Sequence, residues 1–269
     1  MADVLDAGTP LVGMVHLPAL PGAPDYEGDR EAIVERALTD ARALEAGGMD
    51  ALVVENYGNA PFYPEDVPKH VVAEMTAVVQ RVVDAVEIPV GVNVLRNDAD
   101  AALSVAAAAG GSFVRINVHT GAAVTDQGVI EGQAHETLRL RERLDTDVQI
   151  LADVAVKHAA PLADRTIEAE VSDAIERGQA DGIVVSGAAT GESTPQSTVE
   201  GVVAARDDAD PESPVFVGSG VTAETVTDTL DVADGAIVGT ALKEGGETTA
   251  PVDPERVERL VAAADRSWQ

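Results

Sequence analysis

The chain has 269 residues and is strongly acidic: 47 Asp and Glu residues stand against 18 Lys and Arg residues, for a formal net charge of −29 at pH 7. This charge makes nucleic acids and anionic membranes poor partners, and the absence of cysteine excludes disulfides and thiolate metal sites. No segment approaches the roughly 18 consecutive apolar residues of a membrane-spanning helix, and the acidic first ten residues do not resemble a secretory signal. We therefore expect a cytoplasmic protein.

The acidic residues are spread along the whole chain rather than gathered in a tail. At low ionic strength their mutual repulsion opposes a compact state, whereas in about 1 M salt the Debye length falls to about 3 Å and the repulsion is largely screened. Only three of the 18 basic residues are lysines, at positions 69, 157 and 243. The composition therefore predicts a halophilic archaeal protein that works in a salt-rich cytosol.

Eight short, mostly apolar runs recur along the chain, which is typical of strands covered on both faces in a parallel sheet. The runs span residues 11–17, 51–56, 89–95, 113–118, 148–154, 182–186, 215–218 and 235–238. Each is followed by a segment with helical periodicity. These segments span residues 30–46, 67–86, 98–109, 133–144, 166–177, 196–206, 223–230 and 254–264. Eight such units predict one (β/α)8 TIM-barrel domain over residues 1–269, with an open doubly wound sheet as the alternative.

The predicted loops differ between the two ends of the strands. Connections from helix to strand are mostly brief, as at residues 47–50 and 110–112. Connections from strand to helix are often long and rich in Gly, Pro and polar residues, as at residues 119–132. Barrels of this kind carry their active sites on the loops that follow the strands. We therefore expect the functional residues at the carboxyl ends of the strands.

Glycine-containing turns follow the seventh and eighth predicted strands, at residues 218–222 and 238–240. Barrel enzymes often bind phosphate with the loops after these two strands, and glycine lets backbone N–H groups approach phosphate oxygens closely. The predicted phosphate ligands are Gly218, Ser219, Gly220, Gly239 and Thr240. The alternative is that both turns only close the barrel.

Ionisable and polar residues mark the ends of the other predicted strands. The candidates for catalysis are His16, Glu55, His119, Asp153 and Lys157. The candidates for substrate binding are Asn93, Arg115, Asn117 and Ser186. Histidine and carboxylate side chains can move protons, arginine and lysine hold anions, and a desolvated lysine can form a Schiff base. This set predicts acid–base chemistry on an anionic substrate.

Several of these residues also have purely structural explanations. Asn93 and Asn117 could bond to each other inside the barrel, Arg115 could neutralise a neighbouring carboxylate, and His119 could cap the loop that follows it. Arg115, Asn117 and His119 alternate along the fourth predicted strand, so we expect their side chains to point the same way. Lys243 follows the second glycine turn and is a further candidate contact for the anion.

A bound metal ion is a weaker alternative. The carboxylates and histidines at the strand ends could converge on a divalent ion, but their spacing matches no compact ligand motif. We therefore predict neither a metal site nor a cofactor.

Three segments resemble the BtpA/SgcQ family: residues 13–22 (GMVHLPALPG), residues 55–56 (EN) and residues 157–159 (KHA). Residues 218–222 (GSGVT) and 234–240 (DGAIVGT) also fit, although such motifs are shared by many ribulose-phosphate-binding barrels. The resemblance covers nearly the whole chain and implies a TIM barrel. It implies little established chemistry, since one class of members is named for photosystem I assembly and others occur in sugar-utilisation settings.

These observations predict an enzyme that acts on a small phosphorylated metabolite, with a sugar phosphate as the expected substrate. The reaction class stays open between an isomerase, an aldolase or other lyase, and a glycosyl-type transfer. The alternative is a non-catalytic assembly factor of the BtpA type, related to photosystem I biogenesis. The Ala-rich segment at residues 98–109 offers an interface for a homo-oligomer.

Overall fold

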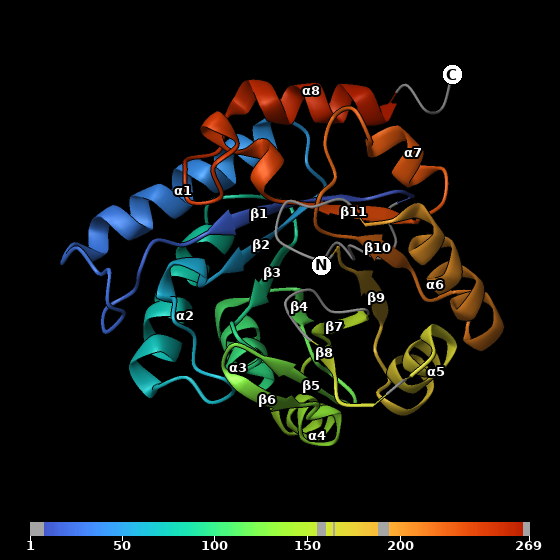
Figure 1. The fold of residues 1–269 in the computed structure, drawn as a ribbon. Helices are drawn as coiled ribbons and strands as arrows, with labels where there is room; N and C mark the ends of the chain where they lie inside the picture. The colour runs from blue at the N-terminus through green and yellow to red at the C-terminus, as the bar shows by residue number, and fades with distance from the viewer. Residues whose placement is uncertain (1–7, 155–159, 164, 188–193, 266–269) are drawn as a thin grey trace.

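Eight parallel strands form a closed barrel in the computed structural model, which describes residues 8–154, 160–163, 165–187 and 194–265 (Figure 1). The barrel strands are β1 (Leu11–His16), β2 (Ala51–Glu55), β3 (Val90–Asn93), β4 (Phe113–Ile116), β7 (Gln149–Val154), β9 (Gly182–Val185), β10 (Val215–Val217) and β11 (Gly235–Val238). Each strand pairs with the next barrel strand along the chain, and β11 pairs with β1 to close the barrel. The predicted (β/α)8 fold and its eight strands are confirmed.

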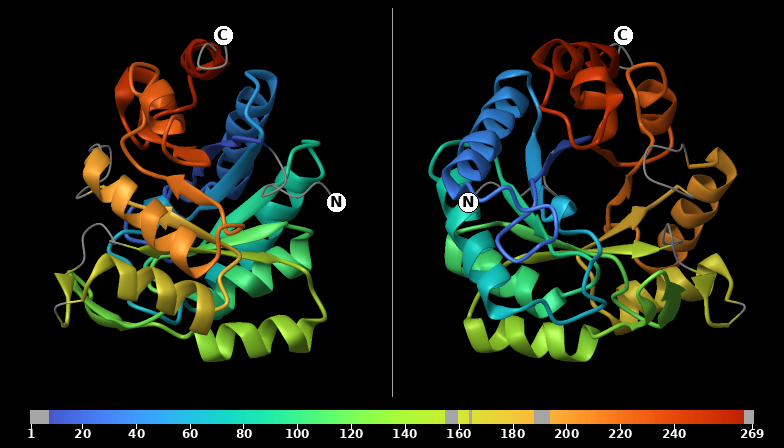
Figure 2. Two further views of the ribbon diagram at one scale, coloured as in Figure 1. Left: turned by 90° about the vertical axis from the view of Figure 1, so that its right-hand side faces the viewer. Right: turned by 60° about the vertical axis from the view of Figure 1, so that its left-hand side comes forward.

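Helices surround the barrel on its outer side, one after each barrel strand (Figures 1 and 2). They are α1 (Arg30–Ala46), α2 (Lys69–Val83), α3 (Ala99–Ala109), α4 (Ala134–Leu144), α5 (Ile167–Ser172), α6 (Gln196–Ala209), α7 (Val226–Leu230) and α8 (Pro254–Asp265). The side chains of Asp29 and Asp98 cap α1 and α3 by accepting hydrogen bonds from backbone N–H groups of the first turn. No helix in these described ranges combines the length and apolar character needed to cross a bilayer.

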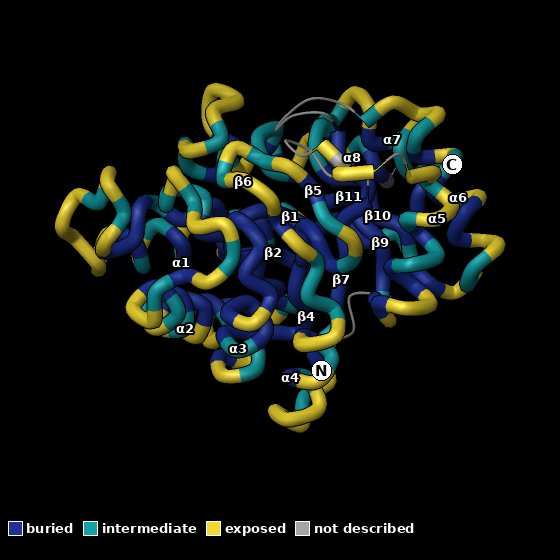
Figure 3. Tube along the Cα trace, turned by 60° about the horizontal axis from the view of Figure 1, so that its bottom comes forward, coloured by how far each residue is buried: buried dark blue, intermediate teal, exposed yellow. Residues whose placement is uncertain are grey.

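The barrel strands are buried on both faces, as their apolar runs predict (Figure 3). One set of side chains fills the barrel interior. This set is Val12, Met14, Ala51, Val53, Phe113, Leu151, Val184, Phe216 and Ile237. The alternate side chains pack outward against the helices. Gly91 makes room for the interior Phe113, because a Cβ at position 91 would lie 2.3 Å from the phenylalanine ring.

A small antiparallel sheet, which the sequence analysis did not predict, is built from the loops that follow β4 and β7. It consists of β5 (Ala122–Thr125), β6 (Gly128–Glu131) and β8 (Ala160–Pro161), in the order β6-β5-β8. Val118, Ala123 and Ile130 form a separate apolar cluster beneath it. Strands of two to four residues contain too little alternation to be recognised by period alone.

The structure contradicts the expectation that Lys243 contacts an anion. The side chain is fully buried, and its Nζ donates to Asp40 Oδ2 on α1 over 3.1 Å. Burial lowers the pKa of Lys243, although the Asp40 carboxylate opposes that effect. Asp40 also accepts from the backbone N–H of Val252 over 2.9 Å. The ion pair therefore ties the loop after β11 to α1.

Candidate functional site

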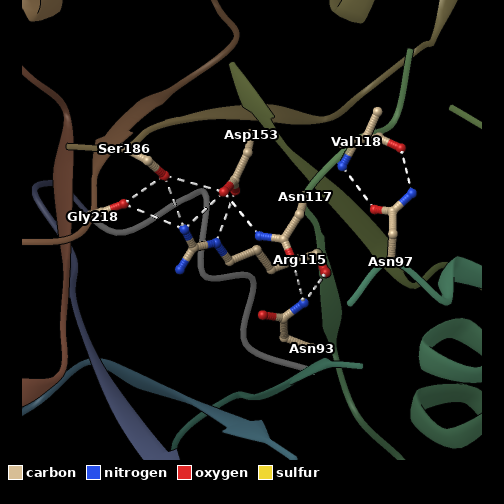
Figure 4. Close-up of polar contacts among 8 residues, drawn as sticks. All are labelled: Asn93, Asn97, Arg115, Asn117, Val118, Asp153, Ser186 and Gly218. Atoms are coloured by element: carbon tan, nitrogen blue, oxygen red, sulfur yellow. Dashed lines mark hydrogen bonds and ion pairs between the residues drawn. The ribbon is translucent and has the colours of Figure 1, made fainter. Parts of the chain in front are cut away.

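A hydrogen-bonded ion pair between Arg115 and Asp153 lies at the carboxyl ends of β4 and β7 (Figure 4). Arg115 Nε donates to Asp153 Oδ1 over 2.8 Å, and a terminal guanidinium nitrogen donates to Oδ2 over 2.9 Å. Both residues are buried. Burial alone would lower the pKa of Arg115, but the Asp153 carboxylate outweighs it and raises that pKa above its usual value. The prediction that Arg115 neutralises a carboxylate is therefore confirmed.

The Asp153 carboxylate is also occupied by two neutral donors. Asn117 Nδ2 and Ser186 Oγ donate to Asp153 Oδ2 over 3.0 Å and 3.1 Å. Ser186 lies 2.9 Å from the carbonyl oxygen of Gly218, which also receives a hydrogen bond from Arg115. Through these bonds, the Asp153 carboxylate on β7 holds the ends of the neighbouring strands β4 and β9 together.

Asparagine side chains join successive strand ends in the first half of the barrel. Asn56 holds the backbone of Leu95, accepting from its N–H over 2.7 Å and donating to its carbonyl over 3.2 Å. Asn97 makes the same pair of bonds to Val118, and Asn93 donates to the carbonyl of Arg115 over 2.9 Å (Figure 4). Asn93 Nδ2 also lies 3.5 Å from Asn117 Oδ1, as expected for two neighbouring amides inside the barrel. These bonds fix the loops that carry the residues around the cavity.

The hydrogen-bonded side chains of Asn93, Arg115, Asn117, Asp153 and Ser186 form a polar layer inside the barrel. A cavity of about 500 Å³ adjoins this polar layer at Arg115 and Asn117. Its polar and glycine lining consists of His16, Glu55, Arg96, Arg115, Asn117, Asp126, Ser219, Gly239 and Thr240. Its apolar lining consists of Met14, Tyr57, Ala60, Phe62, Leu95 and Ile237. The volume falls within the roughly 300–1,000 Å³ range of small-molecule sites.

His16 and Glu55 form an acid–base pair at the ends of the adjacent strands β1 and β2, where they are register partners. His16 Nε2 lies 3.8 Å from Glu55 Oε1, and both side chains are buried. His16 Nδ1 lies 3.0 Å from the carbonyl oxygen of Thr248. A carbonyl can only accept, so Nδ1 carries a hydrogen and Nε2 faces the carboxylate. Tyr57 covers the imidazole, with the two ring centroids 4.9 Å apart.

A smaller pocket of about 150 Å³ lies between the turns that follow β10 and β11. It is lined by Ser219, Gly220, Val221, Thr222, Gly239, Thr240, Ala241 and Gly246. Ser219, Gly239 and Thr240 also line the larger cavity, so the two spaces share a wall. Gly220 has φ +86°, a left-handed conformation that strains any residue with a side chain. The two glycine turns therefore lie side by side on the rim that carries His16 and Glu55.

Four further predicted site residues line neither space in the described structure, and a fifth lies outside it. Asn93, Asp153, Ser186 and Gly218 contribute to the polar layer rather than to the lining of either space. Lys157 lies outside the described residues, as does His158. Across the described ranges, no three histidine or carboxylate side chains cluster as metal ligands would.

His119 lies apart from the cavity. Its Nε2 donates to the carbonyl of Gly178 over 2.8 Å, and it lines neither space. β4 ends at Ile116, so the alternation that aligns Arg115 with Asn117 does not extend to position 119. Within the described part of the chain, His119 Nδ1 has no hydrogen-bond partner. The ring is therefore best explained as a buried support for the loop after β4.

We expect His119 to make stability depend on pH. Burial lowers its pKa below the usual 6.5, so as the pH falls below that value the unfolded chain takes up a proton more readily than the folded chain. The stabilisation is present above pH 6.5 and is lost as the pH falls through the folded-state pKa. Urea unfolding of the wild type and of His119→Gln should show the wild-type advantage shrinking between about pH 7.5 and about pH 5. A constant difference would contradict the buried, neutral imidazole.

Four residues with charged or aromatic side chains line the cavity but were not predicted as site residues. Arg96 directly follows the third apolar run of the sequence, residues 89–95, and this position could have marked it as a candidate. Burial lowers its pKa, while Asp153, Glu55 and Asp126 act in the opposite direction. Asp126 lies in the turn of the β5–β6 hairpin and gave no such signal. Tyr57 and Phe62 belong to a local concentration of aromatic residues in the sequence, which could have identified them as site candidates.

The fold and the cavity define a class of protein, the (β/α)8 barrels with a ligand-sized cavity at the carboxyl ends of the strands. The sequence pattern of the BtpA family matches residues 7–266. The chain therefore belongs to the BtpA family, as the motif resemblance predicts.

Relatives of this chain come from bacteria and archaea. It is 45% identical over 254 residues to the photosystem I biogenesis protein BtpA of Synechocystis sp., covering 94% of this chain and 87% of that protein. It is 44% identical over 261 residues to an uncharacterised protein of Pyrococcus furiosus, covering 97% of each. It is 29% identical over 264 residues to the sgc region protein SgcQ of Escherichia coli, covering 97% and 96%.

Solved structures with the same fold include enzymes. A chain of tryptophan synthase from Mycobacterium tuberculosis aligns with a TM-score of 0.62 at 21% identity, covering 97% of this chain and 96% of that chain. Thiamine phosphate pyrophosphorylase from Pyrococcus furiosus aligns with a TM-score of 0.58 at 15% identity, covering 99% and 100%. At these identities the likeness concerns the fold alone.

Proposed function

We propose that this protein is an enzyme acting on a small phosphorylated metabolite, with a sugar phosphate as the core of the substrate. The observation that carries the proposal is the small pocket between the turns after β10 and β11, which shares a wall with the cavity that contains His16 and Glu55. Phosphate binding at this position is frequent in (β/α)8 barrels. Enzymes with this fold, such as the thiamine phosphate pyrophosphorylase, have phosphorylated compounds in their names.

The residues around the cavity divide into binding and reacting groups. Phosphate binds between Ser219, Gly220 and Thr240, which offer hydroxyl and backbone N–H donors in the two turns. His16 and Glu55 exchange a proton with the carbon skeleton, which suits an isomerase or a lyase. Lys157 remains a sequence-based candidate for the Schiff base of an aldolase.

Ser219→Asp should abolish phosphate binding. The new carboxylate would lie in the wall shared by the two spaces, where it would repel a phosphate dianion. We expect at least a 100-fold loss of affinity for ribose 5-phosphate, about 2.7 kcal/mol, measured by isothermal titration in high salt. Ser197→Asp adds the same charge at an exposed position in the first turn of α6 and should leave affinity unchanged. Equal binding by both variants would contradict a phosphate site at this pocket.

A non-catalytic assembly role is the second candidate, and one structural observation favours it besides the name of the Synechocystis relative. Val124, Val129 and Leu162 are 42%, 51% and 56% exposed and all lie on or beside the small sheet. Val124 and Val129 are cross-strand partners on β5 and β6. An exposed apolar patch of this kind fits a partner surface. The test compares the function of two variants in the native host. Under the assembly role, Ser219→Asp should keep function and the double variant Val124→Asp with Val129→Asp should lose it. Under the enzymatic role, Ser219→Asp should lose function and the double variant should keep it.

We also propose that the protein works in a salt-rich cytosol, where its net charge of −29 is screened. Transfer from molar KCl to dilute buffer should lower the thermal midpoint strongly, and returning KCl should restore it. Sucrose at equal osmolality is the control, because it favours compact states without screening charge. A midpoint that does not depend on KCl would contradict adaptation to salt.

A further inference from the structure

Aromatic residues are scarce in this chain, and they are concentrated beside the cavity. The sequence has one Trp, three Tyr and three Phe. Phe113 and Phe216 fill the barrel interior. Tyr57, Phe62 and Tyr63 lie within seven residues of one another on the loop after β2. Because this chain builds its core from aliphatic residues, the concentration of rings on one partly exposed loop calls for an explanation other than core packing.

Two of these rings form part of the cavity wall. Tyr57 and Phe62 line the cavity together with Ala60 and Leu95, whereas Tyr63 is 51% exposed and does not line it. Tyr57 and Phe62 are half-buried, so each ring keeps accessible surface at the cavity. The hydroxyl groups and phosphate of a simple sugar phosphate find no hydrogen-bond partners on such an apolar wall, and only its small C–H surface can pack there, whereas a planar aromatic ring offers a larger apolar face.

The aromatic wall and the phosphate pocket lie on either side of His16. The barrel order places β1 between β11, whose turn forms the phosphate pocket, and β2, whose loop carries the rings. A Cβ at Gly239 would lie 3.1 Å from His16 Cε1, and the His16 ring centroid is 4.9 Å from that of Tyr57. A ligand that extends from the phosphate pocket to Phe62 therefore passes over His16 and Glu55.

We propose that the substrate is a phosphorylated sugar that carries a planar aromatic ring. This inference rests on the proposed function and narrows its substrate class. The phosphate occupies the pocket beside Ser219, the sugar lies over His16 and Glu55, and the ring packs against Tyr57 and Phe62. Aromatic side chains bind planar rings by stacking or edge-to-face contact. Burying the apolar face of the ligand ring against Tyr57 and Phe62 also removes it from water, which favours binding.

The test is isothermal titration in molar KCl with a ligand series that adds one group at a time. The ligands are inorganic phosphate, ribose 5-phosphate, adenosine 5′-monophosphate and uridine 5′-monophosphate, with adenosine as the ligand that lacks phosphate. We expect at least one nucleotide to bind about tenfold or more tightly than ribose 5-phosphate. Phe62→Ala should remove about tenfold of the nucleotide affinity and leave that for ribose 5-phosphate unchanged. Tyr63→Ala, which removes a neighbouring ring outside the cavity, should change neither affinity.

The outcomes separate this inference from the proposed function. The phosphate site stands if ribose 5-phosphate binds and Ser219→Asp abolishes its binding. In that case, the ring site is contradicted if no nucleotide binds more tightly than ribose 5-phosphate, or if Phe62→Ala does not weaken nucleotide binding. A gain of affinity that Tyr63→Ala removes as strongly as Phe62→Ala would also contradict the cavity wall as the ring site. If adenosine binds as well as its monophosphate and Ser219→Asp changes nothing, the phosphate site itself fails.

Discussion

Asp153→Ala should destabilise the protein by about 3–5 kcal/mol, the cost of leaving one member of a buried ion pair without its partner. Arg115 is 4% exposed and would keep its charge with no counter-ion at hydrogen-bond distance from Nε. Asn117 and Ser186 would each lose an acceptor as well. The measurement is urea unfolding at constant high salt, with the loss read from the midpoint and the slope.

Two further variants separate the ion pair from the loss of any carboxylate. Asp207→Ala removes a 57% exposed partner of Arg206 and should cost no more than about 1 kcal/mol. Combining Arg115→Met with Asp153→Leu removes both charges from the interior and should recover much of the loss, because apolar pairs often replace buried ion pairs at little cost. A loss for Asp153→Ala no larger than that for Asp207→Ala would show that the polar layer does not hold the strand ends.

Glu55→Gln should lower kcat by about 10²–10⁴-fold, the range expected when a general acid–base group is removed. Glutamine has nearly the shape of glutamate but cannot take up a proton at Oε1, the atom that lies 3.8 Å from His16 Nε2. Because the proposed phosphate contacts lie in the turns after two other strands, we expect KM to change much less than kcat. The measurement is steady-state kinetics on the phosphorylated substrate that the ligand series identifies.

Asp126→Asn is the matched control for Glu55→Gln. Asp126 lines the same cavity but lies on the exposed hairpin turn between β5 and β6. The Asp126→Asn variant should reduce kcat by less than about tenfold. Equal losses for the two variants would mean that the cavity needs negative charge rather than a proton acceptor at Glu55.

The barrel could be predicted because its signals are local and repeated. Val12, Val53 and Val184 belong to runs in which both faces of a strand are buried, so the runs are continuously apolar and easy to recognise. The two glycine turns could be placed on one rim because parallel strands share their carboxyl ends. Lateral order in the barrel then followed from chain order.

The polar contacts within the barrel could not be derived in the same way. Asp153 had the residue type and position of a catalytic carboxylate. Its hydrogen bonds to Arg115, Asn117 and Ser186 join the ends of β4, β7 and β9, which are far apart in the sequence. His119 looked inward by alternation, which fails once the extended strand has ended. Asp126 reaches the cavity through a hairpin of four-residue strands that leaves no recognisable period. Long-range hydrogen bonds and short loop strands therefore account for most of the differences.

The central claim is that an oxyanion binds between the turns after β10 and β11, on the rim that carries His16 and Glu55. The most direct measurement is a crystal structure grown with tungstate, a heavy analogue of phosphate, in high salt. The claim predicts an anomalous peak for tungsten inside this pocket, with tungstate oxygens within about 3 Å of donors in residues 219–222 and 239–241. At saturating tungstate, an empty pocket would contradict the claim. A peak found only beside an arginine outside the pocket, such as Arg96, would also contradict it.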